Sequence, residues 1–154
     1  MGDGCGMSTL RPTFRVPRRI VEKPWGREVF IAETPYYVAK IVYMDRNATM
    51  SKHYHEQRHE TLHFLTPECT LEVDYGGGHK EVVHPDVGES FTIEPGVRHR
   101  IAAGPLGARI FEVSTPQPDD VVRVEDPWKQ KRYAQEEPNP PSPPPSGTEP
   151  AARP

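Results

Sequence analysis

The stretch SKHYHEQRHETLHF, residues 51–64, contains four of the chain's seven histidines and two glutamates. In an extended chain, side chains two positions apart point to the same face, so His53 and His55 project together. Glu60 opens the next apolar run, where a carboxylate is costly to bury unless it is paired or bound to a cation. These residue types at this spacing therefore indicate a candidate metal site.

A further histidine, His99, follows the turn EPGV at the start of another strand-like run. Two imidazoles from one strand, a carboxylate from the next and an imidazole from a distant strand can converge inside a small barrel. Three neutral nitrogens and one carboxylate suit Zn, Fe, Mn, Ni or Cu. The HxH pair alone would favour a histidine-rich surface loop, but the full set favours a metal. The remaining histidines are expected to be ordinary ones: His59, His63, His79 and His84.

The elements that must position these groups are short strands. Runs of four to nine residues, rich in β-branched and aromatic residues, are separated by Gly, Pro, Asn or Asp. The runs span residues 36–44, 61–65, 70–75, 80–84, 89–94, 99–103 and 108–115. Many short strands at regular spacing predict an all-β sandwich or barrel.

Both ends of the chain differ in composition from this middle part. Residues 1–13 are mostly small and polar, and eight of the 19 prolines lie between Pro138 and Pro154. Such segments offer no apolar face to bury, which predicts disorder. We therefore expect a disordered arm over residues 1–13, one barrel over 14–133 and a disordered proline-rich tail over 134–154.

Composition also argues against several classes of function. The net charge of -3 provides no global field to attract nucleic acid, and the basic cluster from Arg11 to Arg19 is expected to be a solvated arm. No apolar run approaches the roughly 18 residues of a membrane span. No signal peptide is visible, and two cysteines provide no disulfide framework. We expect a cytoplasmic protein with a small-molecule substrate and no nucleic-acid or membrane partner.

Two segments together carry a family resemblance. HxHxxxxE, from His53 to Glu60, and GESFTIEPGVRH, with Gly88, Pro95, Gly96 and His99, resemble the two-part signature of the cupin superfamily. The resemblance implies a jelly-roll barrel, also called a double-stranded β-helix, and a homodimer. It also implies a divalent metal ion held by His53, His55, Glu60 and His99.

A finer resemblance covers about residues 20 to 132. VEKPWGREVF, HRIAAGP and FEVSTPQPDDVVRVEDPW are similar to the type II mannose-6-phosphate isomerase branch of cupins. That branch usually has Gln where this chain has His53, and His where it has Thr61. The chain thus has the three-His-one-Glu set that is common among cupin dioxygenases. In that branch a guanylyltransferase domain often precedes the barrel; no Gly-rich phosphate loop precedes it in this sequence, so we expect no such domain here.

The resemblance to the isomerases implies a metal-assisted proton transfer between adjacent carbons of an aldose or ketose. Such chemistry needs an acid–base group and, for a phosphate, cations. The resemblance places Glu112 inward as the acid–base group, and we expect Lys40, Arg58 and Arg100 to be the cations. Surface salt bridging is the alternative for both arginines. An Fe(II)-dependent dioxygenase and a non-catalytic metabolite-binding protein stay open as alternative functions.

Overall fold

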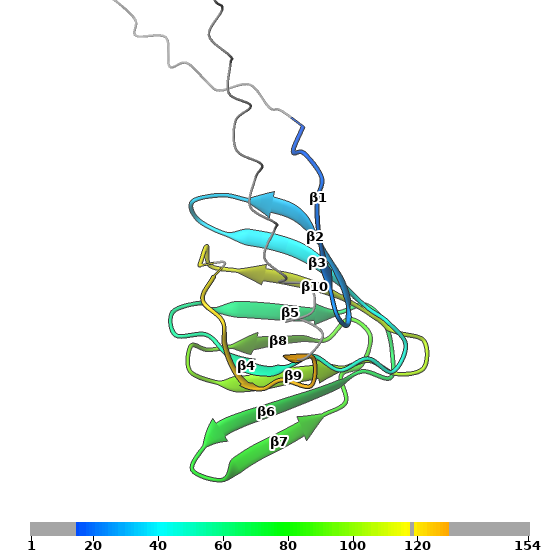
Figure 1. The fold of residues 1–154 in the computed structure, drawn as a ribbon, viewed down its shortest axis with the longest axis vertical. Helices are drawn as coiled ribbons and strands as arrows, with labels where there is room; N and C mark the ends of the chain where they lie inside the picture. The colour runs from blue at the N-terminus through cyan, green and yellow to red at the C-terminus, as the bar shows by residue number, and fades with distance from the viewer. Residues whose placement is uncertain (1–14, 118, 130–154) are drawn as a thin grey trace, which may run out of the picture.

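The structure is a computed structural model, which describes residues 15–117 and 119–129. Within these residues eleven β-strands form two antiparallel sheets (Figure 1). The larger sheet has the order β1 (Arg19–Lys23), β2 (Gly26–Glu33), β3 (Val38–Met44), β10 (Ala108–Ser114), β5 (Glu60–Phe64) and β8 (Ser90–Ile93). The smaller has the order β11 (Val122–Glu125), β4 (Lys52–Tyr54), β9 (Arg98–Ala102), β6 (Thr70–Gly76) and β7 (His79–Val83).

This architecture confirms the predicted all-β barrel. Each of the seven predicted runs coincides with a strand, from β3 and β5 through to β10. Of the other four strands, β4 contains His53, which was expected on a strand, whereas β1, β2 and β11 were not predicted. Arg19, which we had assigned to a solvated arm, instead opens β1 and forms an ion pair with Glu33 at 2.5 Å. The predicted disordered ends, residues 1–13 and 134–154, lie outside the described residues.

The side chains that face into the barrel are apolar at one end and charged at the other. Val42, Ile110 and Phe64 are aligned across β3, β10 and β5, and all three are almost completely buried. One inward position further along the same strands, β3 carries Lys40 and β10 carries Glu112. An apolar core therefore fills one end of the barrel, while charged side chains face inward at the other.

Two glycines form the turns that this arrangement needs. Gly96, with φ of +83°, has a left-handed backbone in the turn before His99, and its N–H donates to the His55 carbonyl at 2.7 Å. Gly26 begins β2, and a Cβ there would lie 2.0 Å from the backbone oxygen of Tyr43. Only glycine allows so close an approach of two backbones. The Gly96 turn thereby joins the two histidine segments.

Candidate metal centre

Three histidines and one glutamate gather at the charged end of the barrel. His53 lies on β4 directly opposite His99 on β9, His55 follows the end of β4, and Glu60 begins β5. Their possible ligand atoms all lie within 4.8 Å of one another. These are the four residues predicted from the sequence, and the cluster could hold a metal ion.

Each imidazole is oriented by a backbone carbonyl. Nδ1 of His53 lies 2.8 Å from the Ser51 oxygen, and Nδ1 of His99 lies 3.0 Å from the Val97 oxygen. Nδ1 of His55 contacts the backbone oxygen of Asp120. Because a carbonyl only accepts hydrogen bonds, each Nδ1 must carry the proton, which leaves the Nε2 lone pair as the ligand.

Glu60 completes the donor set. Its Oε1 lies 2.7 Å from Nε2 of His99, and its Oε2 lies 3.4 Å from Nε2 of His55. Burial acts to raise the pKa of Glu60, but its interactions with the imidazoles of His55 and His99 outweigh burial and hold that pKa well below the usual range. A carboxylate and an Nε2 lone pair so close together require a positive charge, either a proton on Nε2 or a metal ion.

His53 stays neutral in this setting. Burial, followed by repulsion from His99, lowers the pKa of His53 to about 3. A neutral imidazole is the form that binds metals. Together, three oriented Nε2 atoms and one carboxylate fit a divalent first-row metal, and the donor set does not decide which one.

Arg58 lies against the cluster, as expected for a cation near the site. Its side chain is buried, its Nη2 donates to Nε2 of His55 at 2.6 Å, and its Nε lies 3.9 Å from Oε2 of Glu60. The guanidinium therefore takes the same lone pair of His55 that a metal would use. Its Nε has no hydrogen-bond partner among the described residues.

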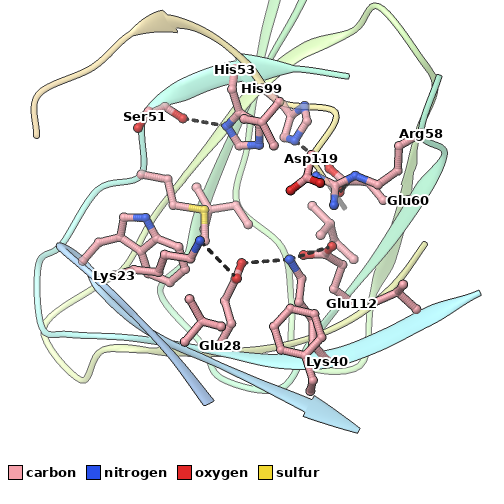
Figure 2. Close-up of a pocket in the computed structure, with 18 of the residues that line it drawn as sticks. Lys23, Glu28, Lys40, Ser51, His53, Arg58, Glu60, His99, Glu112 and Asp119 are labelled. Atoms are coloured by element: carbon pink, nitrogen blue, oxygen red, sulfur yellow. Dashed lines mark hydrogen bonds and ion pairs between the residues drawn. The ribbon is translucent and has the colours of Figure 1, made fainter. Parts of the chain in front are cut away.

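A row of alternating charges crosses the cavity opposite the histidines (Figure 2). Nζ of Lys40 lies 2.8 Å from Oε1 of Glu28 and 3.1 Å from Oε1 of Glu112, and Lys23 lies 3.4 Å from Oε2 of Glu28. Glu112 points inward, as the resemblance implied. The Lys40 contact lacks hydrogen-bond geometry, so Oε1 of Glu112 has no hydrogen-bond partner among the described residues.

These buried charges shift one another's protonation. Burial raises the pKa of Glu112, an effect that the nearby charge of Lys40 opposes without cancelling. Burial acts to lower the pKa of Lys40, but the charges of Glu112 and Glu28 outweigh it and raise that pKa. Lys40 therefore stays protonated. The Glu112 carboxyl group, in contrast, holds a proton more readily than a solvent-exposed carboxyl group does.

The placement of Arg100 corrects one of our predictions. Arg100 lies on the opposite face of β9 from His99, and its guanidinium forms ion pairs with Glu72 at 2.7 Å and Glu125 at 3.1 Å. It does not line the cavity. Neighbouring residues in a strand point to opposite faces, so an inward His99 places Arg100 outside. Arg100 therefore has the salt-bridging role that was the alternative.

His53, Glu60 and His99 of the cluster line one cavity of about 300 Å³ together with the charged row, whereas His55 is not among its lining residues. Sequence reasoning missed one of its acids, Glu28, whose strand was not predicted. The segment before and within β11 contributes Asp119, Val121 and Arg123 to the lining. Asp119 and Arg123 lie in the segment FEVSTPQPDDVVRVEDPW that resembles the isomerase branch, and no role is assigned to them from the sequence.

The barrel and its cluster define a cupin fold, and solved structures show the same fold. KdgF from Halomonas sp. aligns with a TM-score of 0.54 and 23% identity, over 68% of this chain and 92% of that one. CapF from Staphylococcus aureus, described as a capsular polysaccharide assembling protein, aligns with a TM-score of 0.60 and 16% identity, over 73% of this chain. Bacillus subtilis oxalate decarboxylase aligns with a TM-score of 0.60 and 15% identity, over 70% of this chain.

These likenesses show the fold alone, because all three identities are low. The chain spans nearly all of KdgF but only 33% of CapF and 30% of oxalate decarboxylase. No protein-family model and no curated protein matches the chain. Among the described residues no helix is long and apolar enough to cross a membrane. The cytoplasmic location stays a prediction.

Proposed function

We propose that this protein is a metal-dependent, mannose-6-phosphate isomerase-like enzyme that acts on a sugar phosphate or a similar polyhydroxy carbonyl metabolite. The observation that carries the proposal is the position of Glu112. It is a buried carboxyl group in the cavity of the cluster, next to Lys40, and it is not one of the four candidate ligands. A proton-transfer enzyme needs such a group separate from its metal ligands.

Glu112 would act as the base and then as the acid. Its carboxylate takes a proton from the carbon next to the substrate carbonyl, and the resulting carboxylic acid returns that proton to the former carbonyl carbon. The hydroxyl proton moves between the two substrate oxygens, so the reaction conserves every atom. The raised pKa of Glu112 favours holding the proton between the two transfers.

The bound metal would supply Lewis-acid polarisation of the substrate carbonyl. His53, His55, Glu60 and His99 would hold it. The Lys40 ammonium, held between Glu28 and Glu112, would keep the Glu112 side chain in place. The apolar residues of the cavity lining, among them Leu62 and Ile101, would exclude water from the transferred proton.

The charges of the cavity favour an anionic substrate. Its lining contains five cationic side chains, Arg19, Lys23, Lys40, Arg58 and Arg123, and four carboxylates, Glu28, Glu60, Glu112 and Asp119. A divalent metal would add two further positive charges. A phosphate group on the substrate would offset most of that excess. A small-molecule substrate and a homodimer both stay proposals.

An Fe(II)-dependent dioxygenase is the second candidate, and the donor set supports it. Three imidazoles and one carboxylate leave open positions on iron for both substrate and dioxygen. Dioxygenation would not require Glu112 to transfer a proton. A non-catalytic metabolite-binding role is the third candidate, and it would leave the buried Glu112–Lys40 pair without a function.

The deciding experiment is a paired substitution. Glu112→Gln keeps the size of the side chain and removes the base, so it should retain the metal and lower turnover of a sugar phosphate at least about a hundredfold. Glu60→Gln should instead lose the metal. Turnover and metal content are measured for both variants across a small substrate panel, together with oxygen consumption. Full activity in Glu112→Gln, or oxygen uptake by an iron-loaded protein, would overturn the isomerase-like proposal.

A further inference from the structure

One residue far along the chain holds the turn between the candidate ligands. The carboxylate of Asp120 accepts three consecutive backbone N–H groups: Oδ1 from Glu56 at 2.8 Å, and Oδ2 from Gln57 at 2.7 Å and Arg58 at 2.9 Å. The backbone carbonyl of the same Asp120 accepts the Nδ1–H of His55. Asp120 therefore contacts four residues in a row, 55 to 58.

This turn sets the geometry of half the cluster. It joins His55 to Glu60 and also carries Arg58, whose guanidinium reaches the Nε2 atom of His55. The three N–H groups that Asp120 accepts lie between β4 and β5, outside both strands. Backbone donors need partners, and one carboxylate that accepts from three consecutive N–H groups restrains the orientation of their peptides. The direction of the His55 ring therefore depends on Asp120.

Asp120 is itself carried by a structured segment. It shortly precedes β11, which pairs with β4 in the register Val122 to Tyr54 and Arg123 to His53. Further on, the indole Nε1 of Trp128 donates to the Thr49 carbonyl at 2.6 Å, just before β4. The segment thus runs alongside the strand that carries His53 and fixes where Asp120 meets the turn.

We infer that Asp120 is a positioning residue of the metal centre, which fixes the tautomer and direction of His55 by holding residues 55–58. Its carbonyl keeps the proton on Nδ1, and its carboxylate keeps the turn from rotating away from that carbonyl. The inference rests on metal binding by the cluster, and it holds whichever reaction the enzyme performs. Groups that orient a ligand in this way typically contribute about 10-fold to 100-fold in metal affinity.

The test compares three variants of the full chain. Asp120→Ala removes all three hydrogen bonds that the carboxylate accepts. Asp120→Asn keeps one acceptor oxygen, so part of the turn can still donate to it. Thr34→Ala is the matched control, because Oγ1 of Thr34 also accepts two backbone N–H groups, from Tyr36 at 3.1 Å and Tyr37 at 2.9 Å. Thr34 lies between β2 and β3 and does not line the cavity.

Two readouts are measured: the tautomer of His55 in metal-free protein, from its imidazole nitrogen chemical shifts, and Zn²⁺ affinity by competition with a chelator. We expect the Nδ1–H tautomer in the original protein and in Thr34→Ala, and a mixture of tautomers in Asp120→Ala. Zn²⁺ affinity should fall at least about tenfold in Asp120→Ala and less in Asp120→Asn. If Asp120→Ala does not fold, Asp120→Asn supplies both comparisons.

An unchanged tautomer in the Asp120 variants, or a loss of Zn²⁺ affinity that Thr34→Ala matches, would overturn the inference. If the original protein itself binds no Zn²⁺, the proposed metal site fails. The tautomer readout in metal-free protein still decides the role of Asp120 in that case.

Discussion

The guanidinium groups of Arg58 and Arg100 lie on opposite sides of the barrel wall. Arg58 is buried in the cavity against His55, whereas Arg100 is held outside by Glu72 and Glu125. A substrate in the cavity can therefore contact Arg58 and cannot contact Arg100 through that wall. The two arginines provide a matched pair of substitutions.

Arg58→Gln should raise KM for a phosphorylated substrate at least about tenfold, because a charged hydrogen bond contributes about 1.5 to 3 kcal/mol. It should keep the metal, since the lone pair of His55 is freed rather than lost. Arg100→Gln should leave KM unchanged and lower the free energy of unfolding by about 1 kcal/mol or less, because its ion pairs are partly exposed. Steady-state kinetics and urea unfolding measure these effects, and equal rises in KM would contradict this placement.

Some of these residues could be predicted from the sequence, and others could not. The spacing of His53, His55, Glu60 and His99 was sufficient, because strand periodicity and a known motif both apply to it. The same periodicity, applied to the pair His99 and Arg100, already predicts an outward Arg100. The contacts of Asp120 with the turn before Glu60 join segments more than 60 residues apart, and no local pattern indicates them.

At the level of the elements, the start of β2 is the described glycine position with the least room for a side chain. Gly26 has φ of +142° and pairs with Met44, and a Cβ there would lie 2.0 Å from the Tyr43 oxygen. A backbone oxygen cannot move aside as a flexible side chain can. Gly26 therefore sets how closely β2, which carries Glu28, approaches β3, which carries Lys40.

Gly26→Ala should lower the free energy of unfolding by about 2 to 4 kcal/mol through this clash. Gly78→Ala is the control, since Gly78 also has a positive φ, +87°, but nothing lies within 4 Å of the place that an added methyl group would take. Its cost should be about 1 kcal/mol, from the left-handed backbone alone. Urea unfolding of both variants gives the comparison, and equal losses would mean that the β2–β3 contact relaxes freely.

The strands β1, β2 and β11 were missed because their sequences lack a clear hydrophobic periodicity. In β1 and β2 the inward positions include Lys23 and Glu28, which face a polar cavity rather than an apolar core. Alternation of apolar and polar residues is therefore weak there, and hydrophobic periodicity is the signal on which strand prediction depends. No residue of β11 is fully buried, and the strand is held by its pairing with β4. Strands that line a site are thus harder to predict than strands that line a core.

Across the whole molecule, the barrel divides into a packed end and a charged end. Phe64, Leu71 and Ile110 are fully buried in the packed end. That end can stabilise the fold while the other holds Lys40, Glu112 and Glu60 at a cost in desolvation. The overall architecture was predictable because the packed end dominates the strand pattern. Of the charge row, Lys40 and Glu112 were expected at the site, but their ion pairing with Glu28 was not predicted, since it depends on partners from separate strands.

The proline-rich end of the chain should be dispensable for the barrel. Its composition provides little apolar surface to bury, so truncation after Tyr133 should leave both Tm and metal content unchanged. Thermal unfolding and metal analysis of the truncated and full chains test this. A fall in either quantity would mean that residues beyond 133 pack on the barrel.

The most direct test of the central claim is the metal content of protein purified without added metal. Elemental mass spectrometry should find about one first-row metal ion per chain, because three oriented imidazoles and a carboxylate form a complete donor set. The same measurement on Glu60→Gln and His99→Ala should find a large loss, with both variants still folded. An absence of metal in the original protein, or full metal content in these variants, would contradict the assignment of the cluster as a metal centre.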